Sequence, residues 1–286
     1  MAIIYALMSM FFWGLALFLA AIASRKIGNI LTLFWMQIFG FAIGSIYLLF
    51  SPNLASFNLL PPFIPVLFVV ALLQAIGALA YYKGMVKGQV SLVSPLGASY
   101  GLITAILSII FLKEILRLNQ LVAILFIIFG MITISLNLKD LIKNKSIQLL
   151  TGTKEGIIAM LGWGVSLFLL IFPSKELGWF LPSIFFRFLI ILFLLIYILY
   201  SKISFLPKTQ KLPFKLLVFI GLFDILAFFS YSLGVSQGYG SIVGPVSSAS
   251  TLVTIFLGLI FLKEKLGVRK IIGVAAIVGG LVLISI

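Results

Sequence analysis

Residues 81–114 read YYKGMVKGQVSLVSPLGASYGLITAILSIIFLKE, and residues 231–264 read YSLGVSQGYGSIVGPVSSASTLVTIFLGLIFLKE. Fourteen of these 34 positions are identical without a gap, and the two copies lie 150 positions apart. The same offset aligns other parts of the chain: Trp13-Gly14 with Trp163-Gly164, Ser24 with Ser174, Gly28 with Gly178, and Gly130 with Gly280. A shared period this long indicates that one folding unit was duplicated.

Composition predicts that both copies lie in a membrane. Apolar residues make up 63 % of the chain, charged residues make up 9 %, and the mean hydropathy is +1.31. Soluble domains carry about 25 % charged residues. The net charge of +14 would suit a nucleic-acid partner, but the Lys and Arg residues lie in short gaps between apolar runs, where basic residues set membrane orientation. No nucleic-acid partner is therefore expected.

Two residue types are missing, and their absence narrows the chemistry. The chain has no Cys and no His. Disulfides and thiolate metal sites are therefore excluded, and we expect neither a metal nor a cofactor. The N-terminus lacks a basic segment followed by a small-residue cleavage site, so we expect no removable signal peptide.

The apolar runs have the length of membrane-spanning helices, which need about 20 mostly apolar residues. The sequence predicts an all-α polytopic membrane protein with ten such spans. They are residues 2–23, 30–50, 62–82, 90–111, 118–137, 155–174, 181–200, 213–234, 241–262 and 268–286. The longest hydrophilic stretch, 138–154, is predicted to link a first five-helix repeat, 1–137, to a second, 155–286.

An odd number of spans in each repeat forces the second repeat to enter the membrane from the opposite side. The repeats are then related by a pseudo-two-fold axis in the membrane plane, and the substrate site of such proteins lies near the midplane between the halves. Loops 1, 3, 5, 7 and 9, together with the first residues of the spans that follow them, hold 16 Lys and Arg residues, and loops 2, 4, 6 and 8 hold 3. This bias predicts cytoplasmic odd-numbered loops and both termini outside.

Two charged residues are predicted to lie inside the membrane. Asp224 is in the middle of span 213–234, and Arg187 is several residues inside span 181–200. The 150-residue offset places Gln37 at the counterpart of Arg187 and Gln74 at the counterpart of Asp224. Buried charges usually face a bundle interior or a cavity, so we predict a polar cavity lined by these four residues. The alternatives are an ion pair that only ties two spans, a snorkelling Arg187, and interhelical hydrogen bonds.

Spans 90–111 and 241–262 carry a proline followed by small residues. Residues 94–100 read SPLGASY, and residues 244–250 read GPVSSAS. Proline removes a backbone donor and kinks a helix. Pro95 and Pro245 are therefore predicted hinge or kink positions, and Ser94, Tyr100 and Ser247 are candidates for the cavity lining. Close helix packing is the alternative reading of the small residues.

Aromatic residues at mid-span complete the predicted lining. Trp13 and Trp163 lie about mid-span, whereas the tryptophans of an aromatic belt lie at the membrane interfaces. We expect this pair to face the interior, together with Tyr81 and Tyr231. Ordinary packing against lipid is the alternative in a chain with 28 Phe residues.

These features together resemble the drug/metabolite transporter superfamily, and most closely its EamA-type branch. The resemblance rests on two inverted five-helix halves, on Trp-Gly in the first span of each half, and on the proline and small-residue runs that end in FLKE. It implies that each half is one EamA domain, that amino acids, other metabolites or sugars are exported or exchanged, and that both termini are cytoplasmic. The family commonly has an acidic residue where Glu114 and Glu264 stand, and it often has Gly at the positions of Lys113 and Lys263.

A secondary transporter for a small polar metabolite, such as an amino acid or a related solute, is the function that these observations favour. An embedded enzyme would need an acid/base pair, an activated nucleophile or a metal cluster, and this chain offers none. A non-transporting scaffold or lipid-handling protein is the alternative, but it has no need of costly buried charges. No P-loop sequence is present, so ATP-driven transport would require another chain.

The transporter prediction assigns roles and partners. Asp224 is the candidate for carrying a coupling proton, and Arg187 is a candidate for binding a carboxylate or phosphate. The predicted partners are a small-molecule substrate, the lipid bilayer and a proton or counter-substrate. Spans 118–137 and 268–286 would form the contact of a homodimer. The expected location is the plasma (inner) membrane of a prokaryote, whereas the substrate and the direction of transport stay open.

Overall fold

The regular elements in the described part of the chain are all helices. The computed structural model describes residues 1–50, 57–87, 93, 96–135, 152–207, 211–261 and 267–285. The first repeat contains α1 (Ala2–Ile27), α2 (Asn29–Phe50), α3 (Ile64–Lys87), α5 (Tyr100–Phe111) and α6 (Leu118–Ser135). The second repeat contains α8 (Thr153–Leu177), α9 (Phe180–Tyr200), α10 (Phe214–Gln237), α11 (Gly240–Ser248), α12 (Ser250–Phe261) and α13 (Val268–Ser285). Two short 3-10 turns, Phe57–Leu59 and Pro61–Phe63, lead into α3.

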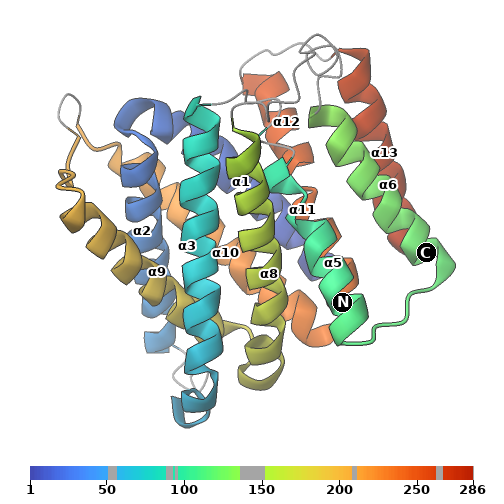
Figure 1. Cartoon of the computed structure of the whole chain (residues 1–286), viewed down its shortest axis with the longest axis horizontal. Helices are drawn as coiled ribbons and strands as arrows, with labels where there is room; N and C mark the ends of the chain where they lie inside the picture. The colour runs from blue at the N-terminus through green and yellow to red at the C-terminus, as the bar shows by residue number, and fades with distance from the viewer. Residues whose placement is uncertain are drawn as a thin grey trace.

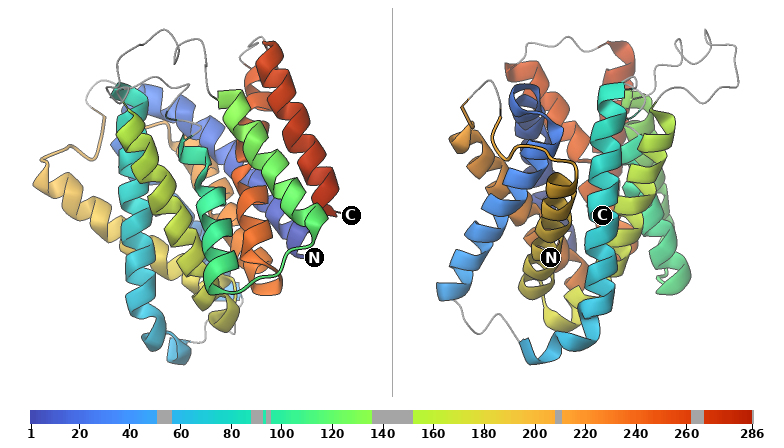
Figure 2. Two further views of the ribbon diagram at one scale, coloured as in Figure 1. Left: turned by 45° about the vertical axis from the view of Figure 1, so that its right-hand side comes forward. Right: turned by 60° about the vertical axis from the view of Figure 1, so that its left-hand side comes forward.

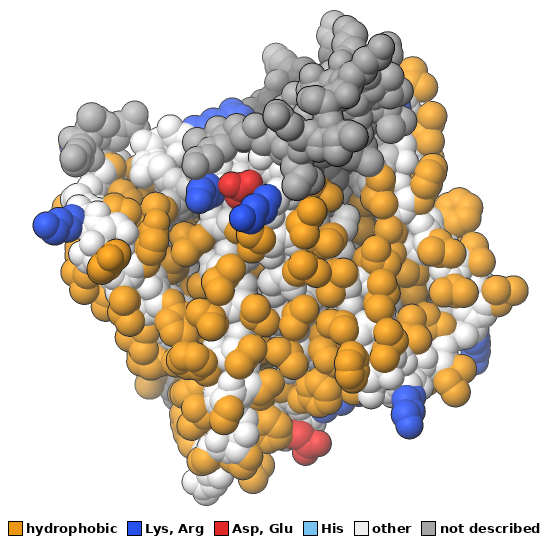
Figure 3. Space-filling model, in the orientation of Figure 1, with side chains coloured by type: hydrophobic (Ala, Val, Ile, Leu, Met, Phe, Trp, Pro, Cys, Tyr) orange, Lys and Arg blue, Asp and Glu red, His pale blue; other side chains and the backbone are white. Residues whose placement is uncertain are grey.

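The helices have the length and the surface of membrane spans. Among the described residues, seven segments are long and apolar enough to cross a membrane: α1, α2, α3, α8, α9, α10, and α11 together with α12. Three shorter apolar helices, Leu96–Phe111, Leu118–Thr133 and Ile271–Ile284, fall on the other three predicted spans. Hydrophobic side chains cover most of the face shown in Figure 3, with charged side chains toward its edges. The prediction of an all-α polytopic membrane protein is confirmed.

The two repeats pack against each other through matched pairs of helices (Figure 1). Helix α1 packs on α10, and their counterparts α8 and α3 pack on each other in the same way. Likewise α2 contacts α10, and α9 contacts α3. Helices α6 and α13, which are counterparts, form a pair at one edge of the molecule (Figure 2). Exchanging the repeats therefore leaves this set of contacts unchanged, as a two-fold axis between inverted repeats requires.

Atomic contacts follow the same offset of 150 residues. A Cβ added to Gly164 would lie 2.9 Å from the Tyr100 carbonyl oxygen, and one added to Gly14 would lie 2.9 Å from the Ser250 carbonyl oxygen. The Thr104 hydroxyl donates to the Gly164 carbonyl at 3.0 Å, and the Thr254 hydroxyl donates to the Gly14 carbonyl at 3.2 Å. Glycine is needed at both places because the crossing helix leaves no room for a side chain.

The glycine pair Gly28 and Gly178 ends α1 and α8 in the same manner. Both residues have a left-handed backbone, with φ of 82° and 76°. Because L side chains rarely adopt this conformation, glycine is the preferred residue for ending a helix here. Each glycine turns the chain directly into the next helix of its repeat.

The proline-containing span of the second repeat is discontinuous. Helix α11 runs through Pro245 and ends at Ser248, and α12 begins at Ser250 after a break at Ala249. The matched residue of the first repeat, Ser99, precedes α5 with nearly the same backbone angles. The predicted kink position Pro95 and the predicted lining residue Ser94 lie outside the described residues, as do Lys263, Glu264 and residues 138–151 of the predicted linker.

Candidate functional site

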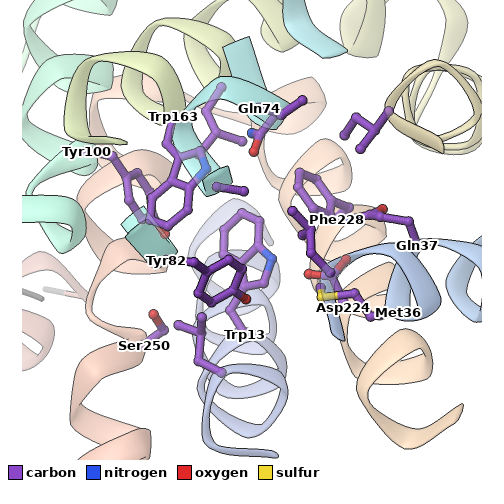
Figure 4. A pocket seen from close by; sticks show the side chains of 16 residues that line it. Trp13, Met36, Gln37, Gln74, Tyr82, Tyr100, Trp163, Asp224, Phe228 and Ser250 are labelled. Atoms are coloured by element: carbon purple, nitrogen blue, oxygen red, sulfur yellow. The ribbon is translucent and has the colours of Figure 1, made fainter. Parts of the chain in front are cut away.

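A cavity of about 100 Å³ lies between the two repeats (Figure 4). We call it the central cavity. Its lining residues are Trp13, Leu17, Leu33, Met36, Gln37, Gln74, Ala75, Ala78, Tyr82, Tyr100, Trp163, Leu167, Ile190, Asp224, Phe228 and Ser250. Ten of the sixteen form five counterpart pairs: Trp13 with Trp163, Leu17 with Leu167, Gln74 with Asp224, Ala78 with Phe228, and Tyr100 with Ser250. The cavity therefore lies on the pseudo-two-fold axis.

Aromatic rings dominate the lining. The ring of Tyr100 lies edge-on to both tryptophans, with centroid distances of 6.2 Å to Trp13 and 6.2 Å to Trp163. Phe228 lies edge-on to Trp13 at 5.0 Å. Edge-to-face packing is a preferred arrangement of aromatic pairs, so these rings hold one another in place.

Arg187 and Asp224 form the ion pair that the sequence offered as an alternative, and the pair lies behind one wall of the cavity. Arg187 Nη2 donates to Asp224 Oδ2 at 2.5 Å, and Arg187 Nη1 donates to Gln37 Oε1 at 2.7 Å. The guanidinium also lies over the Phe228 ring, 5.6 Å from its centroid. Arg187 is 0 % exposed and does not line the cavity, whereas the Asp224 side chain is 8 % exposed and does. The pair therefore turns its carboxylate toward the cavity and its cation away from it.

A close helix crossing makes room for this cluster. A Cβ at Gly40 of α2 would lie 2.6 Å from Arg187 Nη1 and 3.0 Å from the carbonyl oxygen of Gly221 in α10. Replacing either glycine would push α2 and α10 apart. Sequence reasoning missed these two glycines, although a glycine three residues after Gln37 and another three residues before Asp224 were visible signals.

Gln74 takes no part in the ion-pair cluster, although Asp224 is its counterpart. The residue is 8 % exposed and lines the cavity. Within the described ranges its side chain makes no hydrogen bond to the protein. In Figure 4 its amide points toward the space between the aromatic rings. An amide buried in this way is costly unless a ligand or water satisfies it.

A second space connects the central cavity to one end of the molecule. This vestibule has a volume of about 530 Å³ and shares Leu17, Tyr82, Tyr100, Trp163 and Ser250 with the central cavity. Its other lining residues are Ala21, Ser24, Arg25, Asn29, Tyr81, Ala98, Thr251 and Thr254. It leads to the end where α1 finishes and α8 begins, which we call the open end. Tyr81, predicted for the cavity lining, therefore belongs to the vestibule.

The opposite end, where α1 begins and α8 finishes, is packed, and we call it the closed end. Tyr231 is fully buried, and its hydroxyl donates to the Leu167 carbonyl at 3.1 Å. Ser247 is also fully buried, and its hydroxyl lies 3.5 Å from the Ala6 carbonyl oxygen. The structure therefore places these two predicted lining residues in the closed end rather than in the cavity wall.

Glu114 joins the two repeats at the closed end through hydrogen bonds. Its carboxylate accepts hydrogen bonds from the backbone N–H groups of Gly240 and Ser241, both at 2.9 Å, and from the Ser241 hydroxyl at 2.5 Å. These groups form the N-terminus of α11, where a negative charge is favoured. The preceding residue, Lys113, has a left-handed backbone with φ of 52°. That turn directs Glu114 of the first repeat onto a helix of the second.

Several lining residues were missed by sequence reasoning. Tyr82 follows the predicted Tyr81 directly, and Ser250 is the counterpart of the predicted Tyr100. The offset could have found Ser250, and it could have found Leu17 from Leu167. Met36, Leu33 and Ile190 carry no signal in the sequence, because they are apolar residues among many.

A cavity shared by two inverted five-helix repeats, inside an all-α polytopic membrane protein, is the architecture of a membrane transporter. The model of the EamA-like transporter family matches residues 1–136 and 152–286. The chain therefore belongs to the EamA-like transporter family, a group of drug/metabolite-type membrane transporters. The predicted family membership is confirmed.

Two known proteins show how the fold recurs. An uncharacterized protein of Methanocaldococcus jannaschii is 34 % identical over 136 residues, which is 48 % of this chain and 97 % of the relative. That relative is thus little longer than one repeat. A solved crystal structure has a TM-score of 0.75 and 16 % identity, and the match covers 99 % of this chain and 95 % of the other. This second likeness shows the fold alone.

Proposed function

We propose that this protein is a secondary transporter that moves small polar metabolites by alternating access, with the central cavity as its substrate site. The observation that carries the proposal is an asymmetry between matched helix pairs. Helix α8 packs against α10 at the closed end, whereas the described residues of the counterpart pair, α1 and α3, are almost without contact because the vestibule lies between these helices. Because the two repeats share one fold but pack differently at the two ends, each repeat can adopt the conformation of the other. The protein then has two states, each open at one end.

The same asymmetry is seen in single residues. Tyr231 and Leu167 form a hydrogen bond at the closed end, whereas their counterparts, Tyr81 and Leu17, flank the vestibule. Helices α5 and α11 cross so closely that a Cβ at Gly101 would lie 2.8 Å from Ser248 Cβ.

The counterparts of Gly101 and Ser248 indicate where the other state would close. These counterparts are Thr251 and Ala98, and both line the open vestibule. If the repeats exchange their conformations, Ala98 and Thr251 come together while the closed end opens. The substrate cavity, which lies on the axis, is then exposed alternately to the two sides.

Further parts of the proposal concern coupling, assembly and location. Asp224 is the one carboxylate among the cavity-lining residues, so it is the group proposed to couple transport to a proton or a counter-substrate. A homodimer would use the outer faces of α6 and α13. Gly130 and Gly280 are not available for that contact, because a Cβ at either would lie within 3 Å of the partner helix inside this chain, whereas Gly279 faces open space. The proposed location is the plasma membrane of a prokaryote.

A blocked vestibule tests the proposal directly. We would measure uptake of radiolabelled amino acids and choline by proteoliposomes that carry Thr251→Cys, before and after labelling with a bulky maleimide. Labelling should stop saturable uptake, because Thr251 lines the vestibule. The matched control is Phe256→Cys on the same helix, which is 62 % exposed on the outer surface and whose labelling should have little effect.

Two results would contradict the proposal. The first is uptake of every tested solute at the rate of protein-free liposomes, which would favour a non-transporting scaffold. The second is undiminished uptake after Thr251→Cys has been fully labelled, which would show that the vestibule is not the route.

A further inference from the structure

We infer that the central cavity binds the positively charged head of its substrate, so that the transported solutes are small organic cations with an amine or quaternary ammonium group. This inference rests on the proposed function of the cavity as a substrate site. It names the class of solute, which the transport proposal leaves open.

The charge that faces the cavity is negative. Asp224 is the one charged residue among the described residues of the lining, and the guanidinium of Arg187 is fully buried behind it. Both terminal nitrogens of Arg187 are already bonded, one to Asp224 and one to Gln37. A carboxylate or phosphate entering the cavity would meet the Asp224 oxygens first. The geometry therefore does not support the sequence-based expectation that Arg187 receives an anionic substrate.

The rest of the wall favours a cation as well. Two tryptophans, two tyrosines and one phenylalanine line the space: Trp13, Trp163, Tyr82, Tyr100 and Phe228. The face of an aromatic ring carries a partial negative charge that attracts ammonium groups, most strongly for tryptophan and in a desolvated site. The lining residues in Figure 4 surround the space from several helices. The exposed Arg25 lies at the outer end of the vestibule, where water and salt screen its charge.

Gln74 adds a second requirement. The residue is 8 % exposed and lines the cavity, and its side chain has no hydrogen-bond partner among the residues that the structure describes. The amide can both donate and accept. A cation that also carries a hydroxyl, amide or carboxylate group can satisfy it, whereas a cation with only alkyl groups cannot.

The size of the cavity indicates that only the head of the substrate is enclosed in this state. A cavity of about 150 Å³ holds benzene, and the central cavity has about 100 Å³. A trimethylammonium-sized head fills such a space. The remainder of the substrate would extend into the vestibule, which has about 530 Å³.

Three solutes of nearly the same shape test the charge preference. They are choline, dimethylbutanol in which carbon replaces the nitrogen of choline, and the corresponding dimethylbutanoate anion. Binding to the full-length protein in lipid nanodiscs would be measured by titration calorimetry. We expect choline to bind saturably, with a Kd at least about tenfold below that of the alcohol, and the anion to bind most weakly.

The binding test is repeated with variants that keep the Arg187–Asp224 ion pair, so that a change in affinity does not result from loss of this pair. Trp163→Leu should raise the Kd of choline about tenfold and change that of the alcohol much less, because only the cation loses a favourable ring contact. Gln74→Leu should weaken the binding of choline but not the binding of tetramethylammonium, because tetramethylammonium has no hydroxyl group. Phe256→Leu, on the lipid-facing surface, should leave the choline affinity unchanged.

Equal or tighter binding of the alcohol or the anion would overturn the inference, and so would the absence of saturable choline binding. These outcomes are separate from a failure of the transport proposal. If the anion bound most tightly and choline most weakly, while labelling of Thr251→Cys still stopped uptake, the protein would be a transporter of another class of solute. If choline bound more tightly than the alcohol and the anion, but no solute were taken up by proteoliposomes, the protein would bind cations without transporting them.

Discussion

Arg187 donates a hydrogen bond to Gln37 at 2.7 Å although the two residues hold the same place in the two repeats, 150 positions apart. Counterparts related by a two-fold axis can touch only where both lie close to that axis. The contact therefore locates the axis, and Asp224 is recruited to it because a buried guanidinium needs a charged partner. The polar cluster is a joint between the repeats as well as one wall of the cavity.

This joint should dominate the stability of the second repeat. Asp224→Asn leaves Arg187 buried and unpaired, and we expect it to lower the free energy of unfolding by about 3 kcal/mol or more. Arg187→Gln combined with Asp224→Asn removes both charges and should cost less than Asp224→Asn alone. Thermal unfolding in detergent measures both variants. A double variant that is less stable than Asp224→Asn would contradict this account of the pair.

Proton coupling is best tested in the same charge-free background. Within the part of the chain that the structure describes, Asp224 is the one carboxylate that lines the central cavity. Uptake into proteoliposomes by the Arg187→Gln, Asp224→Asn double variant should therefore no longer respond to an imposed pH gradient. The control is Glu155→Gln, because Glu155 lies outside the central cavity. A gradient response as large as that of the wild type would remove the coupling role.

Glu114 should hold the closed end shut. Its carboxylate accepts three hydrogen bonds from Gly240 and Ser241, and it is 8 % exposed. Hydrogen bonds to charged groups contribute about 1.5–3 kcal/mol. Glu114→Gln should therefore speed hydrogen–deuterium exchange at the start of α11 by roughly tenfold or more. The exposed Glu176→Gln is the control, and unchanged exchange in Glu114→Gln would show that the contact is not a latch.

Lys113 stores strain that a glycine would relieve. Its φ of 52° lies in the left-handed region, which costs an L residue about 1 kcal/mol. Lys113→Gly should raise the free energy of unfolding by up to about that amount, whereas Lys113→Ala keeps the Cβ and should not. If thermal unfolding showed no difference between the two variants, the backbone strain would not explain the preference for glycine at this place.

The offset of 150 residues predicted much of the fold and only part of the candidate site. Because the repeats share a fold, matched apolar runs predicted which helices exist, and their odd number predicted the inversion. The offset also paired Gln37 with Arg187 and Gln74 with Asp224 as counterparts in the two repeats. The sequence did not predict which of these four residues would line the cavity. The choice depends on the angle at which α2 and α10 cross at Gly40 and Gly221.

The sequence could not predict the state of the molecule either. Tyr81 and Tyr231 are counterparts in sequence, yet one lines the vestibule and the other is fully buried in the closed end. A symmetric pattern cannot say which of two equivalent ends is packed, since this is decided by the balance of contacts such as the one that Glu114 makes. The roles assigned to the site residues therefore stay predictions until variants are measured.

The exchange of conformations between the repeats is the central claim, and one disulfide tests it most directly. Ala98→Cys with Thr251→Cys places two thiols across the vestibule in a chain that has no other Cys. These residues are the counterparts of Ser248 and Gly101, which are packed together at the closed end. A disulfide needs Cα atoms within about 7 Å, and the exchange of conformations would bring these two positions together as Ser248 and Gly101 are now. We predict that mild oxidation in membranes forms this bond, that the bond stops transport, and that reduction restores it. A pair that never crosslinks while transport continues would contradict alternating access between the two repeats.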